Sequence, residues 1–192
     1  MNFSLYKAWQ HFNTITKHRH KVITHCAKAG ILFQGLLHDL SKYTPTEFME
    51  GARFYQGTRS PNEAERESRG FSNAWIHHKG RNRHHFEHWT DYDPVTKTIA
   101  PVKMPVKCVI EMFCDRVAAS KIYKGSSYTD DMPLQYFMGA KHRRVIQQDT
   151  AALLEYLLVM LRDKGEKETF RYIKSIRKLK DYSAKDFEIN ER

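Results

Sequence analysis

The chain has 192 residues, 41% of them hydrophobic, which is enough to form the core of a single domain. Its 32 Lys and Arg residues against 22 Asp and Glu give a net charge of +10, which favours anionic partners such as phosphorylated metabolites, nucleotides or nucleic acid. No apolar stretch approaches the roughly 20 residues that a membrane span needs, and the N-terminus lacks the blocks of a signal peptide. These features predict a cytosolic protein that does not enter a membrane.

The first half of the chain shows helical periodicity and little alternation of apolar and polar residues. The first helix is expected to end at Gly30, a residue suited to a helix C-terminus, and Thr44-Pro45 gives the start signal of the third. The predicted elements are helices over 5–29, 33–42 and 44–55, a surface loop over 56–70, a short helix over 71–78, a turn over 79–83, one helical turn over 84–89, and an irregular segment over 91–104.

In the second half, Pro105 opens a strongly apolar helix, and shorter helices follow over 133–141, 149–162 and 167–179. Cys26, Cys108 and Cys114 are odd in number and lie in apolar contexts, so buried free thiols are expected rather than disulfides. The basic residues of 164–180 alternate with acidic ones and indicate a solvated helix face. The expected fold is an all-α, single-domain helical bundle over 1–180 with a loose tail over 181–192.

Ten of the eleven histidines cluster in two regions of the sequence, and His142 stands apart. The clustering suggests metal binding because imidazole is the commonest metal ligand. The pair His38-Asp39 follows an apolar run, and we expect both side chains to reach one metal ion from a single core helix. On the first helix, His18 lies on the face marked by Trp9, Phe12, Ile15, Val22, Cys26 and Ala29, whereas His11 and His20 are expected on the surface. A buried structural histidine is the alternative for His18.

Asp115 lies in the apolar helix that Pro105 opens, four residues after Glu111, so both carboxylates share one face. A buried carboxylate requires a partner. That partner is either a metal ion or a cation such as Arg116, and the sequence leaves both open.

His18, the pair His38-Asp39 and Asp115 follow one another in the order His, His-Asp, distant Asp. Lys42 follows the pair with the spacing of an HD-x-G-K run, and Ser41 stands where glycine is usual. This order resembles the HD-domain superfamily of all-helical, metal-dependent phosphohydrolases. The segment 74–85, AWIHHKGRNRHH, is similar to that of a bacterial and phage HD-like family without an assigned reaction, and this resemblance runs from residue 9 to about 173.

The resemblance implies a bundle whose core holds one or two divalent metals, the first bound by His18, His38, Asp39 and Asp115. Extra histidines between the pair and the last aspartate mark the two-metal members of the superfamily. Candidates for the second metal are His78 and one or both of His84 and His85. Within the adjacent pairs 77–78 and 84–85 we expect one side chain to point elsewhere, and we favour the histidines at 78 and 84.

These ligands favour hydrolysis at phosphorus on a nucleotide or another small phosphorylated compound. Mixed imidazole and carboxylate ligands suit manganese, iron or zinc. In this interpretation Asp39 binds or bridges metal and orients water, while Lys42 and Arg81 neutralise phosphate charge. The alternative for Arg81 is a structural role in its loop. The segment at 79–80 is Lys-Gly where cyclic-dinucleotide phosphodiesterases carry glutamate and GYP, so that activity is not implied.

Two other functional classes stay open. The first is a nucleotide- or nucleic-acid-binding module without catalysis, which the basic balance supports, and whose binding would fall steeply with salt and survive chelation. The second is an oxygenase with a di-iron centre, because HD folds also support that chemistry. Tightly held iron without phosphatase activity would indicate it.

Overall fold

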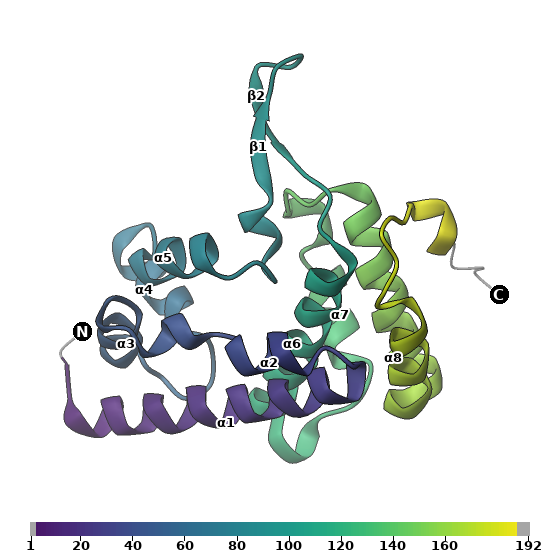
Figure 1. Cartoon of the computed structure of the whole chain (residues 1–192). Coiled ribbons are helices and arrows are strands. Elements are labelled where there is room, and N and C mark those ends of the chain that lie inside the picture. The colour runs from purple at the N-terminus through teal and green to yellow at the C-terminus, as the bar shows by residue number, and fades with distance from the viewer. Residues whose placement is uncertain (1–2, 188–192) are drawn as a thin grey trace.

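The computed structural model describes residues 3–187 and is mostly helical (Figure 1). In its first half the elements are α1 (Leu5–Ala29), α2 (Leu32–Leu37), the 3-10 helix η1 (Leu40–Tyr43), α3 (Pro45–Arg53), α4 (Pro61–Arg69), α5 (Asn73–Arg81) and the 3-10 helix η2 (Phe86–His88). The second half contains β1 (Thr90–Asp93), β2 (Thr98–Pro101), α6 (Val106–Lys124), η3 (Gly125–Ser127), α7 (Met132–Met138), η4 (Lys141–Arg143), α8 (Gln148–Ile176) and η5 (Ala184–Phe187). The predicted helical domain is confirmed, apart from one small sheet.

The core is centred on α6, which packs between α1 and α8. Val109, Phe113 and Val117 of α6 are fully buried, and apolar residues surround this helix on most sides, as expected for an internal helix. Leu154 and Leu158 of α8 close the core from the other side. The strong helix predicted after Pro105 is confirmed, and it places Asp115 at the centre of the molecule.

Helix α2 packs against α1 at unusually short range because Gly35 has no side chain. A β-carbon at this position would lie 2.6 Å from Cβ of Cys26, which is itself fully buried. Gly30 separates the two helices, and its φ of 77° allows its N–H to cap the end of α1. The predicted C-terminus of the first helix is therefore confirmed.

The predicted helix over 33–42 is wrong in a way that matters for the site. Helix α2 ends at Leu37, His38 has extended backbone, and Asp39 adopts the left-handed conformation with φ of 55° before η1 begins. Arg19 of α1 holds this break, because its guanidinium donates to the carbonyl oxygens of Leu36 and His38. Both carbonyls lack helical partners at this point, so the arginine takes the place of the helix's own hydrogen bonds.

Two segments predicted as irregular contain regular structure. The expected loop over 56–70 includes α4, which starts at Pro61 in the first helical turn. The expected excursion over 91–104 forms a β-hairpin in which Thr90 pairs with Pro101 and Asp93 with Thr98. In Figure 1 this hairpin projects away from the helices, and its strands are mostly exposed. Because neither face of these short strands is buried, the sequence carries no alternation of apolar and polar residues that would predict them.

The predicted inner face of the first helix is also partly wrong. Trp9 is 62% exposed and Phe12 is exposed, whereas His11, expected on the surface, is buried. Gly51 of α3 makes room for His11, since a β-carbon there would lie 2.3 Å from the imidazole Nε2. His20 is exposed, as predicted.

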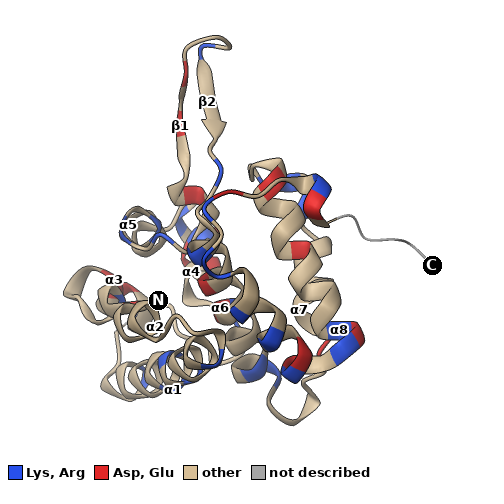
Figure 2. Cartoon of the chain, turned by 45° about the vertical axis from the view of Figure 1, so that its right-hand side comes forward, with Lys and Arg blue, Asp and Glu red and all other residues tan. Residues whose placement is uncertain are grey.

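The C-terminal part, α8, consists of two helical segments that meet at a kink, where Gly165 has non-helical φ of 72° and ψ of 174°. The two helices predicted over 149–162 and 167–179 are therefore confirmed. After α8, Tyr182 and Phe187 are buried against the core, so residues 181–187 do not form part of the loose tail predicted over 181–192. Residues 188–192 of that tail lie outside the described residues. The three cysteines are buried and free, as predicted. Lys and Arg residues are distributed over the whole fold with acidic residues between them (Figure 2). Over residues 3–187 no helix is long and apolar enough to cross a membrane.

Candidate metal centre

Separate segments of the chain bring histidine and aspartate side chains together at one buried point. Helix α1 contributes His18, the break between α2 and η1 contributes His38 and Asp39, and α6 contributes Asp115. The remaining residues come from α5 and the turn after it, and they are His78, His84 and His85. All seven residues proposed from the sequence as metal ligands therefore meet in the structure.

The first group combines two imidazoles and two carboxylates. His18 Nε2 lies 2.9 Å from Asp115 Oδ1, and His38 Nε2 lies 3.2 Å from Asp39 Oδ2 and 3.7 Å from Asp115 Oδ1. One atom from each of these four residues falls within 4.8 Å of the others. A cation at their centre would have mixed nitrogen and oxygen ligands.

The second group uses the other oxygen of Asp39. Oδ1 lies 3.3 Å from His78 Nε2 and 3.5 Å from His84 Nε2, and His85 Nε2 lies 2.9 Å from His78 Nε2. We expected only one of His84 and His85 to face the site, and the structure brings both there. They precede η2 in non-helical backbone, so adjacent side chains are not forced onto different helix faces.

Asp39 thus stands between the two groups, with one carboxylate oxygen directed to each. Its left-handed backbone, with φ of 55° and ψ of 24°, turns the side chain inward at the end of α2. Aspartate and asparagine tolerate this conformation better than other residues that have a side chain. The sequence predicted that both members of the His-Asp pair reach the site, but not that a helix break presents them.

Several atoms that face the centre lack hydrogen-bond partners. Among the described residues, Nε2 of His18, His38 and His84 and both carboxylate oxygens of Asp39 are buried and form no hydrogen bond of ordinary geometry. Charged or polar groups still lie close to two of these residues, since Lys42 Nζ is 2.7 Å from Asp39 Oδ2 and Asp115 Oδ1 is 2.9 Å from His18 Nε2. An unpartnered polar group is unfavourable in a protein interior. The set of unpaired imidazole nitrogens and carboxylate oxygens therefore fits a divalent cation of the zinc, iron or manganese type.

Two glutamates fix the imidazoles from behind. Glu111 accepts hydrogen bonds from Nδ1 of His38 at 3.0 Å and lies 3.2 Å from Nδ1 of His84. Glu47 of α3 accepts from Nδ1 of His78 at 2.7 Å and of His77 at 2.6 Å. A proton held on Nδ1 leaves Nε2 free for a metal, and carboxylates commonly orient metal-binding histidines in this way. His77 uses this contact outside the centre, so His78 is the member of its pair that faces inward.

Charge in the centre is strongly coupled. Burial disfavours ionised Asp39, but His38, Lys42 and His78 outweigh it and hold the pKa of its carboxyl well below the ordinary value. Burial likewise disfavours protonated His38, yet Asp39, Glu111 and Asp115 raise its pKa to about 10. In both cases the carboxylates are stabilised by positive charge close to them. A metal ion in the centre would supply the same positive charge.

A comparison with known protein families places this chain. Residues 7–160 match the model of a family described as "Family of unknown function (DUF5662)". The chain belongs to this family. No curated protein and no solved structure matches it. The matched range of the DUF5662 family includes every residue of both groups, from His18 to Asp115.

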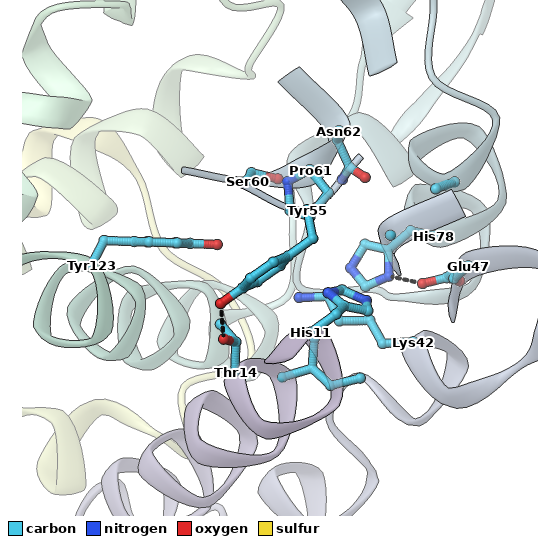
Figure 3. Close-up of a pocket in the computed structure, with 13 residues that line it drawn as sticks. His11, Thr14, Lys42, Glu47, Tyr55, Ser60, Pro61, Asn62, His78 and Tyr123 are labelled. Carbon is cyan, nitrogen blue, oxygen red and sulfur yellow. Dashed lines mark hydrogen bonds and ion pairs between the residues drawn. The ribbon is translucent and has the colours of Figure 1, made fainter. Parts of the chain in front are cut away.

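Two residues, Lys42 and Arg81, were proposed to neutralise phosphate charge, and Lys42 lies beside the candidate metal ligands. Its ammonium is 2.7 Å from Asp39 Oδ2, and it lines a small cavity of about 70 Å³ together with His11, Tyr55 and Tyr123. In Figure 3, Tyr55 and Tyr123 approach this cavity from the side opposite His78 and Glu47. Ser41, the residue found where similar motifs have glycine, accepts a hydrogen bond from Asn82 at 2.8 Å and so ties η1 to α5.

Arg81 is not brought to the centre. It is exposed at the end of α5, where it donates to the carbonyl oxygen of His77 and borders an outer hollow with Glu50 and Met49. The structural alternative for Arg81 is therefore favoured over phosphate binding. Asp115 forms no ion pair with Arg116; its close partner is the imidazole of His18, whose Nε2 lies 2.9 Å from Asp115 Oδ1.

A larger cavity of about 590 Å³ opens beside the metal groups and includes Asp115 and His85 in its wall. This volume lies within the range of roughly 300–1,000 Å³ typical of small-ligand sites. Tyr123, Ser60 and Asn62 line both this cavity and the smaller one at Lys42. The two cavities therefore adjoin, and a ligand in the larger one would contact Asp115 of the first group and His85 of the second.

Sequence reasoning missed three residues that organise this site: Arg19, Glu47 and Glu111 as a histidine partner. The spacing of Glu111 four residues before Asp115 was noted, but its contact is with histidines rather than with a metal. Glu47 was assigned only to a helix start. No signal in the sequence separates it from an ordinary helix-start glutamate, because its burial depends on the packing of α3 against α5.

Proposed function

We propose that the chain binds two divalent metal ions, one in each group with Asp39 between them, and hydrolyses a phosphate ester or anhydride of a nucleotide or other small phosphorylated compound. The observation that carries this proposal is the arrangement of Asp39. Its two carboxylate oxygens face separate sets of imidazole nitrogens, and Nε2 of His18, His38 and His84 is buried without a hydrogen bond of ordinary geometry.

Two divalent ions would supply Lewis acidity, by lowering the pKa of water and by neutralising charge on a phosphoryl group. The chain's own residues would divide the remaining work. Asp39 and Asp115 hold negative charge at the centre, Glu47 and Glu111 keep the imidazoles in one tautomer, and Lys42 places a positive charge beside Asp39. Lys42 is suited to contact phosphate, because an ammonium binds phosphate oxygens as a point charge.

The order of ligands along the chain supports the same proposal. His18, His38-Asp39 and Asp115 occur in the order that is typical of the HD-domain superfamily, and the additional histidines 78, 84 and 85 occur where its two-metal members carry theirs. The helical fold is consistent with membership of that superfamily. This resemblance favours phosphohydrolase chemistry over the other reactions that a histidine-rich centre can support.

The first test is elemental analysis of protein purified without chelator or affinity metal, together with release of inorganic phosphate from a panel of nucleotides and phosphomonoesters. We expect about two equivalents of manganese, iron or zinc per chain. His18→Gln should lose metal and turnover, whereas His20→Gln on the exposed face of the same helix should retain both.

Asp39→Asn isolates the bridging charge, since asparagine accepts the same left-handed backbone. We expect this variant to fold and to lose at least one metal equivalent, with turnover abolished. Lys42→Met should retain both metals and lose turnover. Full metal and activity in Asp39→Asn would contradict the proposal, and two equivalents of iron without phosphatase activity would redirect it to oxygen chemistry.

A further inference from the structure

Arg116 of α6 and Arg144, which follows η4, differ from the other arginines near the metal centre. Arg116 Nε and Arg144 Nη1 are buried and have no hydrogen-bond partner among the described residues. Arg116 Nη2 donates to the thioether sulfur of Met112 at 3.9 Å, a weak acceptor. A buried guanidinium nitrogen without a partner is unfavourable. Glu87 is the carboxylate whose charge acts on both side chains, yet its own Oε2 is also unpartnered, so all three groups are available to a bound ligand.

The two guanidinium groups are held against one aromatic wall. The central carbon of Arg116 lies 5.8 Å from the ring centre of Phe137, and that of Arg144 lies 5.6 Å from the same ring. Arg144 also lies 5.3 Å from the ring centre of Tyr136. The fold therefore brings two like charges together, which is favourable only if an anion joins them.

Neighbouring arginines show what a satisfied side chain looks like in this region. Arg59 forms paired hydrogen bonds with the carboxylate of Glu67, and Arg69 contacts Glu50 and Glu65. These arginines also lie on or near the rim of the molecule. The unpaired state of Arg116 and Arg144 is thus a local feature and not a consequence of the overall positive charge.

Both arginines line the 590 Å³ cavity that also contains Asp115 and His85 of the metal groups. Glu87 lines the same cavity, and its Oε2 is likewise buried without a partner. The cavity is therefore lined by three kinds of group: candidate metal ligands, two arginine guanidinium groups and the carboxylate of Glu87. A ligand that satisfies all three has two anionic groups and a hydrogen-bond donor.

We propose that Arg116 and Arg144 bind a second phosphoryl group of the substrate, one that is not hydrolysed, so that the substrate is a small molecule with two separate phosphate groups. The identity of the hydrolysed group rests on the proposed function above. Guanidinium forks match phosphate oxygens in a bidentate manner. Glu87 would accept a hydrogen bond from a hydroxyl of the part that connects the two phosphates, as in a phosphorylated sugar or nucleoside.

Inorganic phosphate is the probe for this second site, and its binding to the full chain is measured by isothermal titration calorimetry. The variants are Arg116→Gln, Arg144→Gln, Asp39→Asn and, as a control, the exposed Arg81→Gln. We expect each of the first two to weaken phosphate binding by at least about tenfold. Binding should persist in Asp39→Asn, where the metal groups are disrupted, and should be unchanged in Arg81→Gln.

Phosphate that binds equally well to wild type and to both arginine variants would overturn the inference, as would the absence of saturable binding to wild type. Phosphate lost in Asp39→Asn but retained in the arginine variants would place it at the metals and reject the second site. If wild type binds phosphate through the arginines but holds no metal, the proposed hydrolysis fails while the anion site stands.

Thermal melting provides a second measurement that does not depend on calorimetry. In phosphate-free buffer, Arg116→Gln and Arg144→Gln should melt no lower than wild type, because each removes a buried unpaired charge. Added phosphate should raise the melting temperature of wild type and leave that of the two variants unchanged. Should a glutamine variant fail to fold, Arg116→Lys and Arg144→Lys retain the charge, and we expect them to bind phosphate more weakly than wild type. Lysine variants that bind as tightly as wild type would contradict the proposal.

Discussion

Replacing Glu111 by glutamine tests whether the centre is organised from behind by carboxylates. Glu111 is buried and faces Nδ1 of His38, in the first group, and Nδ1 of His84, in the second. Glutamine keeps the shape and one acceptor but removes the charge. We therefore expect the variant to fold and to bind both metals more weakly.

The size of the effect follows from the carboxyl's own ionisation. Burial raises the pKa of Glu111, but hydrogen bonds with His38 and His84 outweigh it and lower the pKa from 4.5 to about 2. That net difference corresponds to about 3 kcal/mol in favour of the ionised carboxylate, after the cost of its burial. A glutamine that retains part of it should weaken metal binding by about 10- to 100-fold, as is typical when a partner of a metal-binding histidine is changed.

Competition with a chromophoric chelator for Zn²⁺ and Mn²⁺ measures both dissociation constants. Gln34→Ala is the control, because Gln34 contacts the other oxygen of Glu111 at 3.0 Å and touches neither imidazole, and its effect should stay below about threefold. Glu47→Gln should weaken only one metal, since Glu47 contacts His78 of the second group. Equal affinity of Glu111→Gln and wild type for both metals would refute the reasoning.

Three further results are expected. Gly35→Ala should lower the free energy of unfolding in urea by about 1–3 kcal/mol, because the new methyl would lie 2.6 Å from Cβ of Cys26. The control Gly80→Ala, which has open space around it, should not lower that free energy. Equal urea midpoints for Gly35→Ala and wild type would show that α2 shifts without cost. Burial lowers the pKa of His25 to about 4, so below pH 6.5 the unfolded chain binds more protons than the folded chain. Between pH 7 and pH 5, wild type should therefore lose roughly 2 kcal/mol more free energy of unfolding than His25→Gln. The same loss of stability with pH in both proteins would contradict this. Chelation should lower the melting temperature of wild type but not of Asp39→Asn, and an unchanged wild type would show that the centre forms without metal.

The periodicity of apolar residues was enough to predict the long helices and the position of Asp115, because α6 is apolar on most sides and its start is marked by Pro105. It was not enough to predict the break at Asp39. That break depends on Arg19, which lies in a different helix and satisfies the carbonyls that α2 leaves free. The position of His11 depended in the same way on the missing side chain of Gly51.

The candidate site was more predictable than the contacts that support it. Histidine and aspartate are rare enough in apolar contexts for His18, His38 and Asp115 to stand out in the sequence. Glu47 could not be separated from an ordinary helix-start glutamate, since its role depends on how α3 meets α5. The phosphate-binding role predicted for Arg81 was based on its charge and its position in the histidine-rich segment. Neither feature predicts the direction in which its side chain points at the end of α5.

The hairpin of β1 and β2 separates His85 from Asp115 in the sequence but not in the metal centre. Its base is closed by a 2.8 Å hydrogen bond from the N–H of Val102 to the carbonyl oxygen of Trp89, so the chain leaves and returns at one point. Insertions or deletions within 90–101 would therefore leave both ligands in register. A sequence pattern for related proteins should accordingly allow a gap of any length here, while keeping the spacing from His78 to His85 fixed.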